Sequence, residues 1–145
     1  MGGGLWKHEG RRSGKVVNAV GITFLKVRVI NPRYPETKSK ELEFLVDSGA
    51  VYSVLPQAIL KGLGIKPVRT QEFILANGEV VKKRLGNANF EYQGIVGAAP
   101  VVFGNKGVFL LGATTLEALG MILDPIRREL KPLPMVLMPL GAVEA

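Results

Sequence analysis

Glycine and proline interrupt this sequence so often that little room is left for long helices. The 145 residues include 18 Gly and 9 Pro, and few segments run for a dozen residues without either. Short strands joined by tight turns are the default for such a sequence, so we predict an all-β fold. The length suffices for one ordinary hydrophobic core and is too small for two domains.

One globular domain is expected over residues 16–145, after a flexible basic tail over residues 1–15. The tail holds four basic residues and three consecutive glycines, and it shows no apolar periodicity. Residues 16–25 follow it as the apolar part of a signal peptide would, but no small-residue cleavage site ends them and they continue as a strand pattern. No stretch approaches the roughly 20 apolar residues of a spanning helix. We therefore expect a cytoplasmic protein with no membrane partner.

The rarest side chains narrow the chemistry. The sequence has no cysteine and one histidine, His8, which excludes thiol nucleophiles, disulfides, and any imidazole-based triad or zinc site. We expect no metal and no cofactor, so any catalysis falls to carboxylates. Asp47 and Asp124 are the only aspartates. A reaction that needs two aspartates must take both from these positions, or one from each of two chains.

The net charge of +7 raises the question of a nucleic-acid partner. The basic residues lie in small separate clusters, such as Lys82-Lys83-Arg84, and no aromatic residues are interleaved with them as stacking platforms. A solvated basic surface accounts for this pattern. A nucleic-acid-binding β domain stays open as the weaker alternative, supported by charge alone.

Apolar runs punctuated by turn residues predict the strands. They are expected at residues 16–30, with a break near Gly21, and at 42–46, 51–55, 89–92, 94–103 and 108–111. Residues 31–41 are expected to form a surface loop, and residues 57–62 to turn helically. The clearest hairpin covers residues 73–85 and is joined across Asn77-Gly78, a pair that tolerates positive φ at both centres.

One short helix is predicted near the C-terminus. Thr114 and Glu117 form a capping box, Gly120 supplies the stop, and Leu116 and Leu119 give the helix one apolar face to lay on the sheet.

The segment 44–50, Phe-Leu-Val-Asp-Ser-Gly-Ala, is the main candidate for chemistry. It holds Asp47 at the end of an apolar strand, before a glycine that lets backbone approach closely. An isolated Asp-Ser-Gly triplet is more often a simple turn in which the aspartate caps its own backbone.

The context of this triplet resembles the retropepsin-like aspartic protease family, most closely its small prokaryotic single-domain members. The apolar-apolar-Asp-Thr/Ser-Gly-Ala signature continues here with Ser53, Val54 and Leu55. A second family element, two hydrophobic residues and a glycine, matches Leu110-Leu111-Gly112, and the separation from Asp47 to Gly112 is 65 residues. The Asn77-Gly78 hairpin lies between them, where the family places its flap. The resemblance covers residues 16–125.

The resemblance implies an acid-protease barrel with one short C-terminal helix, active as a homodimer. Asp47 of each chain would supply one carboxylate of the dyad, the Ser48 hydroxyl would bond to the partner loop, and the Gly49 amide would donate to the carboxylate. The implied reaction is hydrolysis of a polypeptide by a water that the dyad activates.

The resemblance also implies a set of substrate-binding residues. The walls and flap tip that would contact an extended apolar peptide are Leu45, Ala50, Val54, Ala76, Asn77, Gly78, Val108 and Leu110. For the aliphatic members of this set, a purely structural role in the hydrophobic core is equally compatible with the sequence. Lys82-Lys83-Arg84 on the flap arm would favour acidic residues further along the substrate.

Departures from the viral pattern keep a second alternative open. Viral enzymes carry two acids after the motif's alanine and an arginine after the second glycine, where this chain has Val51, Tyr52 and Ala113. The acidic residues and the arginine are absent together, so this chain keeps no unpaired charge at these positions. A catalytically silent dimerisation module of the same fold is compatible with these changes.

Overall fold

The structure is a computed structural model that describes residues 17–19, 22–124, 126–127 and 129–134. The predicted basic tail and His8 lie outside the described residues. The strands are β1 (Val17–Ala19), β2 (Ile22–Ile30), β3 (Lys38–Val46), β4 (Ser53–Pro56), β5 (Arg69–Ile74), β6 (Val80–Tyr92), β7 (Ile95–Gly104), β8 (Leu110–Leu111), β9 (Met121–Asp124) and β10 (Glu129–Pro132), and the helices are α1 (Gln57–Gly62) and α2 (Ala113–Ala118).

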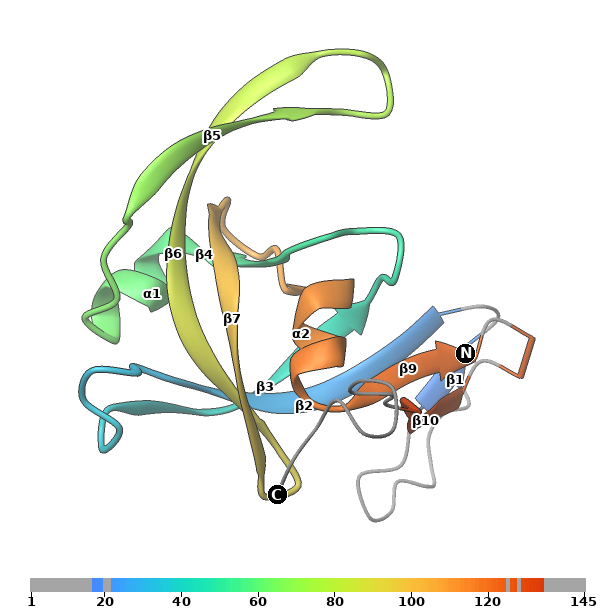
Figure 1. Ribbon diagram of the computed structural model, residues 1–145. Helices are drawn as coiled ribbons and strands as arrows, with labels where there is room; N and C mark the ends of the chain where they lie inside the picture. The colour runs from blue at the N-terminus through green and yellow to red at the C-terminus, as the bar shows by residue number, and fades with distance from the viewer. Residues whose placement is uncertain (1–16, 20–21, 125, 128, 135–145) are drawn as a thin grey trace, which may run out of the picture.

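Most of the strands form a closed barrel, which confirms the all-β prediction. The sheet runs in the order β1-β2-β3-β8-β4-β7-β6-β5, and an additional pairing of β2 with β6 closes it (Figure 1). Alternate residues of each strand point inward. The six strands of the closed ring, β2, β3, β8, β4, β7 and β6, each supply at least one fully buried side chain: Val27, Phe44, Leu111, Leu55, Val101 and Phe90, in that order. β9 and β10 form a separate two-stranded sheet.

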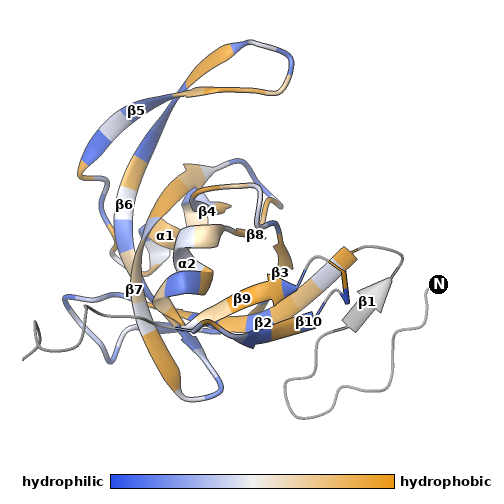
Figure 2. Cartoon of the chain, turned by 45° about the vertical axis from the view of Figure 1, so that its right-hand side comes forward, coloured by the Kyte–Doolittle hydropathy of each residue, from blue (hydrophilic) through white to orange (hydrophobic). Residues whose placement is uncertain are grey.

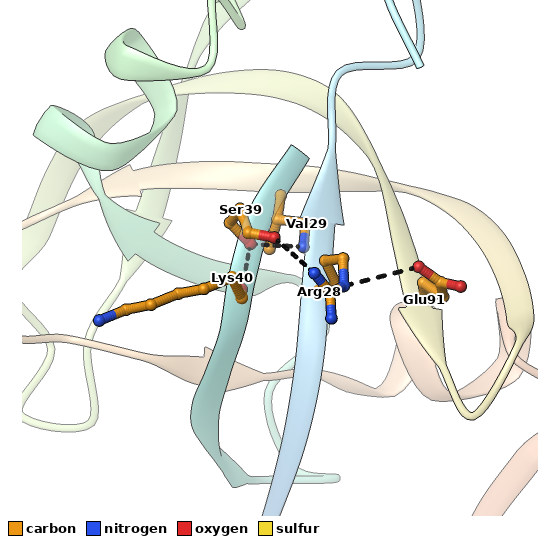
Figure 3. Close-up of polar contacts among 5 residues, drawn as sticks. All are labelled: Arg28, Val29, Ser39, Lys40 and Glu91. Carbon is orange, nitrogen blue, oxygen red and sulfur yellow. Dashed lines mark hydrogen bonds and ion pairs between the residues drawn. The ribbon is translucent and has the colours of Figure 1, made fainter. Parts of the chain in front are cut away.

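A bulge shapes the seam where β2 contacts β3 and β6. Arg28 pairs with Glu41 but Ile30 pairs with Lys38, so β3 carries one extra residue in this interval. At this bulge the Ser39 hydroxyl replaces a backbone acceptor of the strand pairing, because it accepts a hydrogen bond from the Val29 amide at 2.9 Å (Figure 3). On the other side of β2, Arg28 lies 3.8 Å from the carboxylate of its cross-strand partner, Glu91.

Several predicted boundaries were wrong because tertiary pairing overrides local pattern. β3 begins at Lys38, inside the predicted 31–41 loop, because its polar residues pair with β2. β4 begins at Ser53 rather than residue 51, since residues 47–52 form a turn. By contrast, the helical turn expected over residues 57–62 is confirmed as α1, which the fold contains beside the short C-terminal helix.

The predicted capping box is also wrong. α2 has Gly112 at its N-cap position and no side-chain cap, because the Ala113 and Thr114 amides donate to backbone carbonyls before β4 and the Thr115 hydroxyl bonds to Ser53 of β4. The apolar face and the stop are confirmed, since Leu116 and Leu119 are buried and Gly120 has a φ of +73°.

The hairpin of β5 and β6 projects from the barrel as a long arm (Figure 1). Its turn has three residues, 76–78, closed by a hydrogen bond from the Leu75 amide to the Glu79 carbonyl. Gly78 has a φ of +90°, whereas Asn77 is not in the positive-φ region and instead accepts from the Glu79 amide. The hairpin prediction is confirmed, but positive φ at both centres is wrong, because the three-residue loop needs only one left-handed residue.

The arm and the barrel differ in the distribution of apolar residues. Most barrel strands carry long orange, hydrophobic stretches in Figure 2, while the arm alternates orange with blue and the turn at its tip is mainly blue. Near this tip Ile74, Leu75 and Val80 are exposed. Among the described residues, no helix is long and apolar enough to cross a membrane.

Candidate active site

The pairing of β3 with β8 positions Asp47. These strands run parallel, with Leu45 opposite Leu110 and Val46 opposite Leu111. The Asp47 amide donates to the Leu111 carbonyl at 2.9 Å, so the aspartate leaves the barrel beside Gly112. The two sequence elements that are 65 residues apart are thereby brought together at one end of the barrel.

A tight turn holds the Asp47 carboxylate. The Gly49 amide donates to Asp47 Oδ1 at 2.9 Å, and the Ala50 amide donates to the Asp47 carbonyl at 3.1 Å. A Cβ at position 49 would lie 3.2 Å from the same carboxylate oxygen, tighter than most such contacts. Asp47, Ser48 and Gly49 are all exposed in the single chain. The carboxylate is therefore oriented by backbone and open to an approaching group.

The start of α2 is hydrogen-bonded to this turn. The Ala113 amide donates to the Ala50 carbonyl at 2.8 Å and the Thr114 amide to the Val51 carbonyl at 3.0 Å. A Cβ on Gly112 would lie 2.6 Å from the Tyr52 carbonyl, so only glycine allows the two segments to approach this closely. The second family element is thus a packing requirement of the active-site turn.

A buried hydroxyl pair lies beneath the turn. Ser53 Oγ and Thr115 Oγ1 are 2.5 Å apart, and Ser53 Oγ also accepts from the Gly112 amide at 3.0 Å. Both side chains are fully buried. Removal of either hydroxyl would leave a buried polar group without its partner. The pair ties β4, the Gly112 backbone and α2 into one support.

Two residues of this region were missed by the sequence interpretation. Thr115 was overlooked, although it lies four residues before Leu119 and therefore on the same buried helical face. Phe73 was read only as part of the hairpin, but its ring packs edge-on against Tyr52 at 6.2 Å between centroids. No local sequence signal reveals the contact between Phe73 and Tyr52, because the two residues lie on different elements.

The predicted substrate-binding residues fall into two groups. Leu45, Leu110 and Val54 lie on adjacent strands, since Leu110 pairs with both of the others, and all three are half-buried. Val108, two residues before Leu110, is 38% exposed, and Ala50 is half-buried in the turn. The second group, Ala76, Asn77 and Gly78, is exposed at the far tip of the β5–β6 arm (Figure 1).

Asp124 lies in a different environment from Asp47. It ends β9, and its Oδ1 accepts hydrogen bonds from the backbone amides of Ile126 and Arg127. These bonds, with Lys131 nearby, hold the pKa of Asp124 below its ordinary value. Within the described ranges, no cluster of three or more His, Cys, Asp or Glu side chains could hold a metal ion.

A family model described as gag-polyprotein putative aspartyl protease matches residues 36–118, more than half of the chain. The chain belongs to this family. The matched aspartyl protease segment contains the Asp47 turn, the β5–β6 arm and Gly112, and it ends at the last residue of α2. The expected retropepsin-like aspartic protease class is confirmed.

Solved structures similar to this aspartyl protease family member include the solution structure of the simian foamy virus (mac) protease. It is 21% identical, the match covers 63% of this chain and 90% of that one, and the TM-score is 0.46. Comparison with curated proteins gives no match.

Proposed function

We propose that this chain is an aspartic endopeptidase that cleaves extended, apolar-flanked polypeptide segments as a homodimer. The observation that carries the proposal is the Asp47 carboxylate, held by the Gly49 amide at 2.9 Å yet exposed in the single chain. A single such carboxylate lacks the second acid that the reaction requires. Asp124 does not supply this second acid, since its Oδ1 accepts hydrogen bonds from two backbone amides that follow β9.

A second copy related by a two-fold axis would bring another Asp47 to the first. Two carboxylates at hydrogen-bonding distance share one proton, because like charges this close disfavour double ionisation. One carboxylate then accepts a proton from water while the other acid donates to the scissile carbonyl. In this scheme the exposed Ser48 hydroxyl bonds to the partner's turn, and the Gly49 amide fixes the carboxylate orientation.

The proposed substrate is an extended peptide with apolar side chains near the scissile bond. The adjacent positions of Leu45, Val54 and Leu110 support this, together with the exposed aliphatic surface of Val108. The β5–β6 arm would act as a flap, with residues 76–78 over the substrate. Main-chain hydrogen bonds to an extended peptide would provide affinity, and alternate side chains would provide specificity.

The decisive experiment compares Asp47→Asn with Asp124→Asn. Both changes remove one carboxylate per chain and preserve side-chain shape. With a denatured protein mixture as substrate, Asp47→Asn should lower hydrolysis by roughly 10²–10⁴-fold or more, since it removes the acid–base pair. Asp124→Asn should retain the wild-type rate. Both variants should sediment as folded dimers.

The silent-module alternative rests on Val51 and Tyr52, which stand where the viral enzymes carry acids. Under this alternative, the wild-type and Asp47→Asn proteins should be equally inactive and both should still dimerise. The same comparison therefore separates the two functions. An active Asp47→Ala protein would refute both the dyad and the assignment of Asp47.

A further inference from the structure

A polar pocket of about 230 Å³ lies where the β5–β6 arm joins the barrel. The arm contributes Thr70, Lys82, Lys83 and Arg84, and the body contributes Gln57 of α1 with Phe103, Gly104 and Asn105 at the end of β7. Three of these side chains are cationic, and no carboxylate lines the pocket. This pocket volume is several times the roughly 30 Å³ that one water molecule occupies.

The basic side chains are partly held in place. Arg84 Nη2 donates to Gln57 Oε1 at 2.8 Å, and its guanidinium lies 5.6 Å from the centre of the Phe103 ring. Lys83 Nζ lies 3.5 Å from Asn105 Oδ1. In the described part of the chain, neither lysine nor Arg84 forms an ion pair. Glu72 lies directly across from Lys82 in the sheet, but it does not line the pocket.

The pocket extends around the edge of β6 at the base of the arm, because three consecutive residues of this strand line it and successive strand residues point to opposite faces. Phe73 packs on Tyr52 and therefore marks the face that looks toward the active-site turn. Its cross-strand partner is Val81, so Lys83 lies on this face, whereas Lys82 and Arg84 point to the opposite one. The contact of Arg84 with Gln57 and Phe103 agrees with this direction.

We infer that this pocket is a binding site for a compact, doubly charged oxyanion of the phosphate type, either free or as a monoester. Three cations without a carboxylate among them suit a dianion, and the hydroxyl of Thr70 and the amides of Gln57 and Asn105 add neutral polar groups. Such an anion would bridge the arm and the body. It would therefore restrain the base of the arm without touching Asp47.

The test is a titration of isotopically labelled protein followed by amide chemical shifts. Inorganic phosphate is added at about pH 8, where both it and a phosphate monoester are mostly dianions, with sodium chloride holding the ionic strength constant. Saturable shifts are expected at Thr70, Lys82, Lys83, Arg84 and Asn105. A parallel titration with O-phosphoserine distinguishes the sources, because a site for a monoester binds both ligands and a site for the free ion binds inorganic phosphate alone.

A matched pair of variants separates a site from general charge. Lys82→Gln/Lys83→Gln should weaken phosphate binding by roughly tenfold or more, because charge-assisted hydrogen bonds are lost. Lys38→Gln/Lys40→Gln removes the same charge from exposed positions of β3 and should bind as wild type does. Equal weakening by both pairs, shifts that do not saturate, or the same shifts in chloride would overturn the site.

The bridging role has its own readout. Saturating phosphate should slow amide hydrogen exchange in β5 and in the arm half of β6, and unchanged exchange with the site occupied would show that the anion does not restrain the arm. The titration reports binding and not hydrolysis, so Asp47→Asn protein should behave as wild type. Failure of the peptidase proposal and failure of this one are therefore distinguishable.

Discussion

The ring of Tyr52 meets the ring of Phe73 edge-on, with centroids 6.2 Å apart and planes at 89°. Tyr52 ends the active-site turn, and Phe73 lies on β5 of the arm. This aromatic pair is a side-chain contact between the turn that carries Asp47 and the arm proposed as the flap.

Tyr52→Ala should loosen the arm. Loss of the aromatic contact is expected to cost about 0.5–1.5 kcal/mol of arm docking, since edge-to-face pairs are worth about that much beyond area burial. Amide exchange in β5 should rise while exchange in β3 stays unchanged. Tyr52→Phe retains the ring and serves as the control. Equal exchange in β5 for wild type and Tyr52→Ala would show that the pair does not hold the arm.

Ser53→Ala should lower global stability by about 1–3 kcal/mol, because the Gly112 amide and the Thr115 hydroxyl both lose a buried partner. Thr115→Val should cost less, since the Gly112 bond to Ser53 remains. Denaturant unfolding of the two single variants and the double variant measures their coupling. Additive losses would mean that the 2.5 Å contact contributes little of its own.

Gly78→Val should perturb only the tip of the arm. No atom lies within 4 Å of a Cβ at this position, so the cost arises from the φ of +90° and is about 1–2 kcal/mol. Turnover should fall while the midpoint of global unfolding hardly moves. Ala76→Val, in the same turn at a permitted φ, is the control. If hydrogen exchange finds the tip as protected as β3, the flap interpretation is wrong.

Asp124→Asn should change the pH dependence of stability. Hydrogen bonds from the backbone amides of Arg127 and Ile126 hold the pKa of Asp124 below its ordinary value, so the ionised group stabilises the folded state at pH values above its unfolded pKa. That contribution is lost as the pH falls through the lowered folded pKa. Wild type should therefore be the more stable protein near neutral pH, with the difference shrinking in acid. A difference that is constant with pH, measured by thermal unfolding, would contradict this.

The stoichiometry of inhibition tests the dyad. An inhibitor with a hydroxyl that mimics the tetrahedral intermediate should bind once per two chains, because Asp47 from both copies completes one site. Activity should fall on both sides of an acidic-to-neutral optimum, because the Asp47 pair takes up a second proton at low pH and loses its shared proton at high pH. Calorimetric titration decides the first point, and one inhibitor per chain would mean that each chain owns a complete site.

Local signals in the sequence were sufficient for the all-β class, the arm hairpin, the short C-terminal helix with its Gly120 stop, and the placement of Asp47 and Gly112 in one site. These features depend on residues close together in sequence, or on a motif whose two parts the family resemblance already relates. Turn chemistry and strand alternation are encoded over a few residues, so they can be read without the fold.

Tertiary structure alone decided which distant side chains meet. Ser53 and Thr115 are 62 positions apart, Tyr52 and Phe73 lie on the active-site turn and the arm, and the basic pocket collects residues from α1, β5, β6 and β7. The closed barrel determines these encounters through strand order and register, which local preferences leave open. For the same reason Thr115 was overlooked: a hydroxyl bonds to whatever buried partner the packing provides, and that partner is 62 residues away.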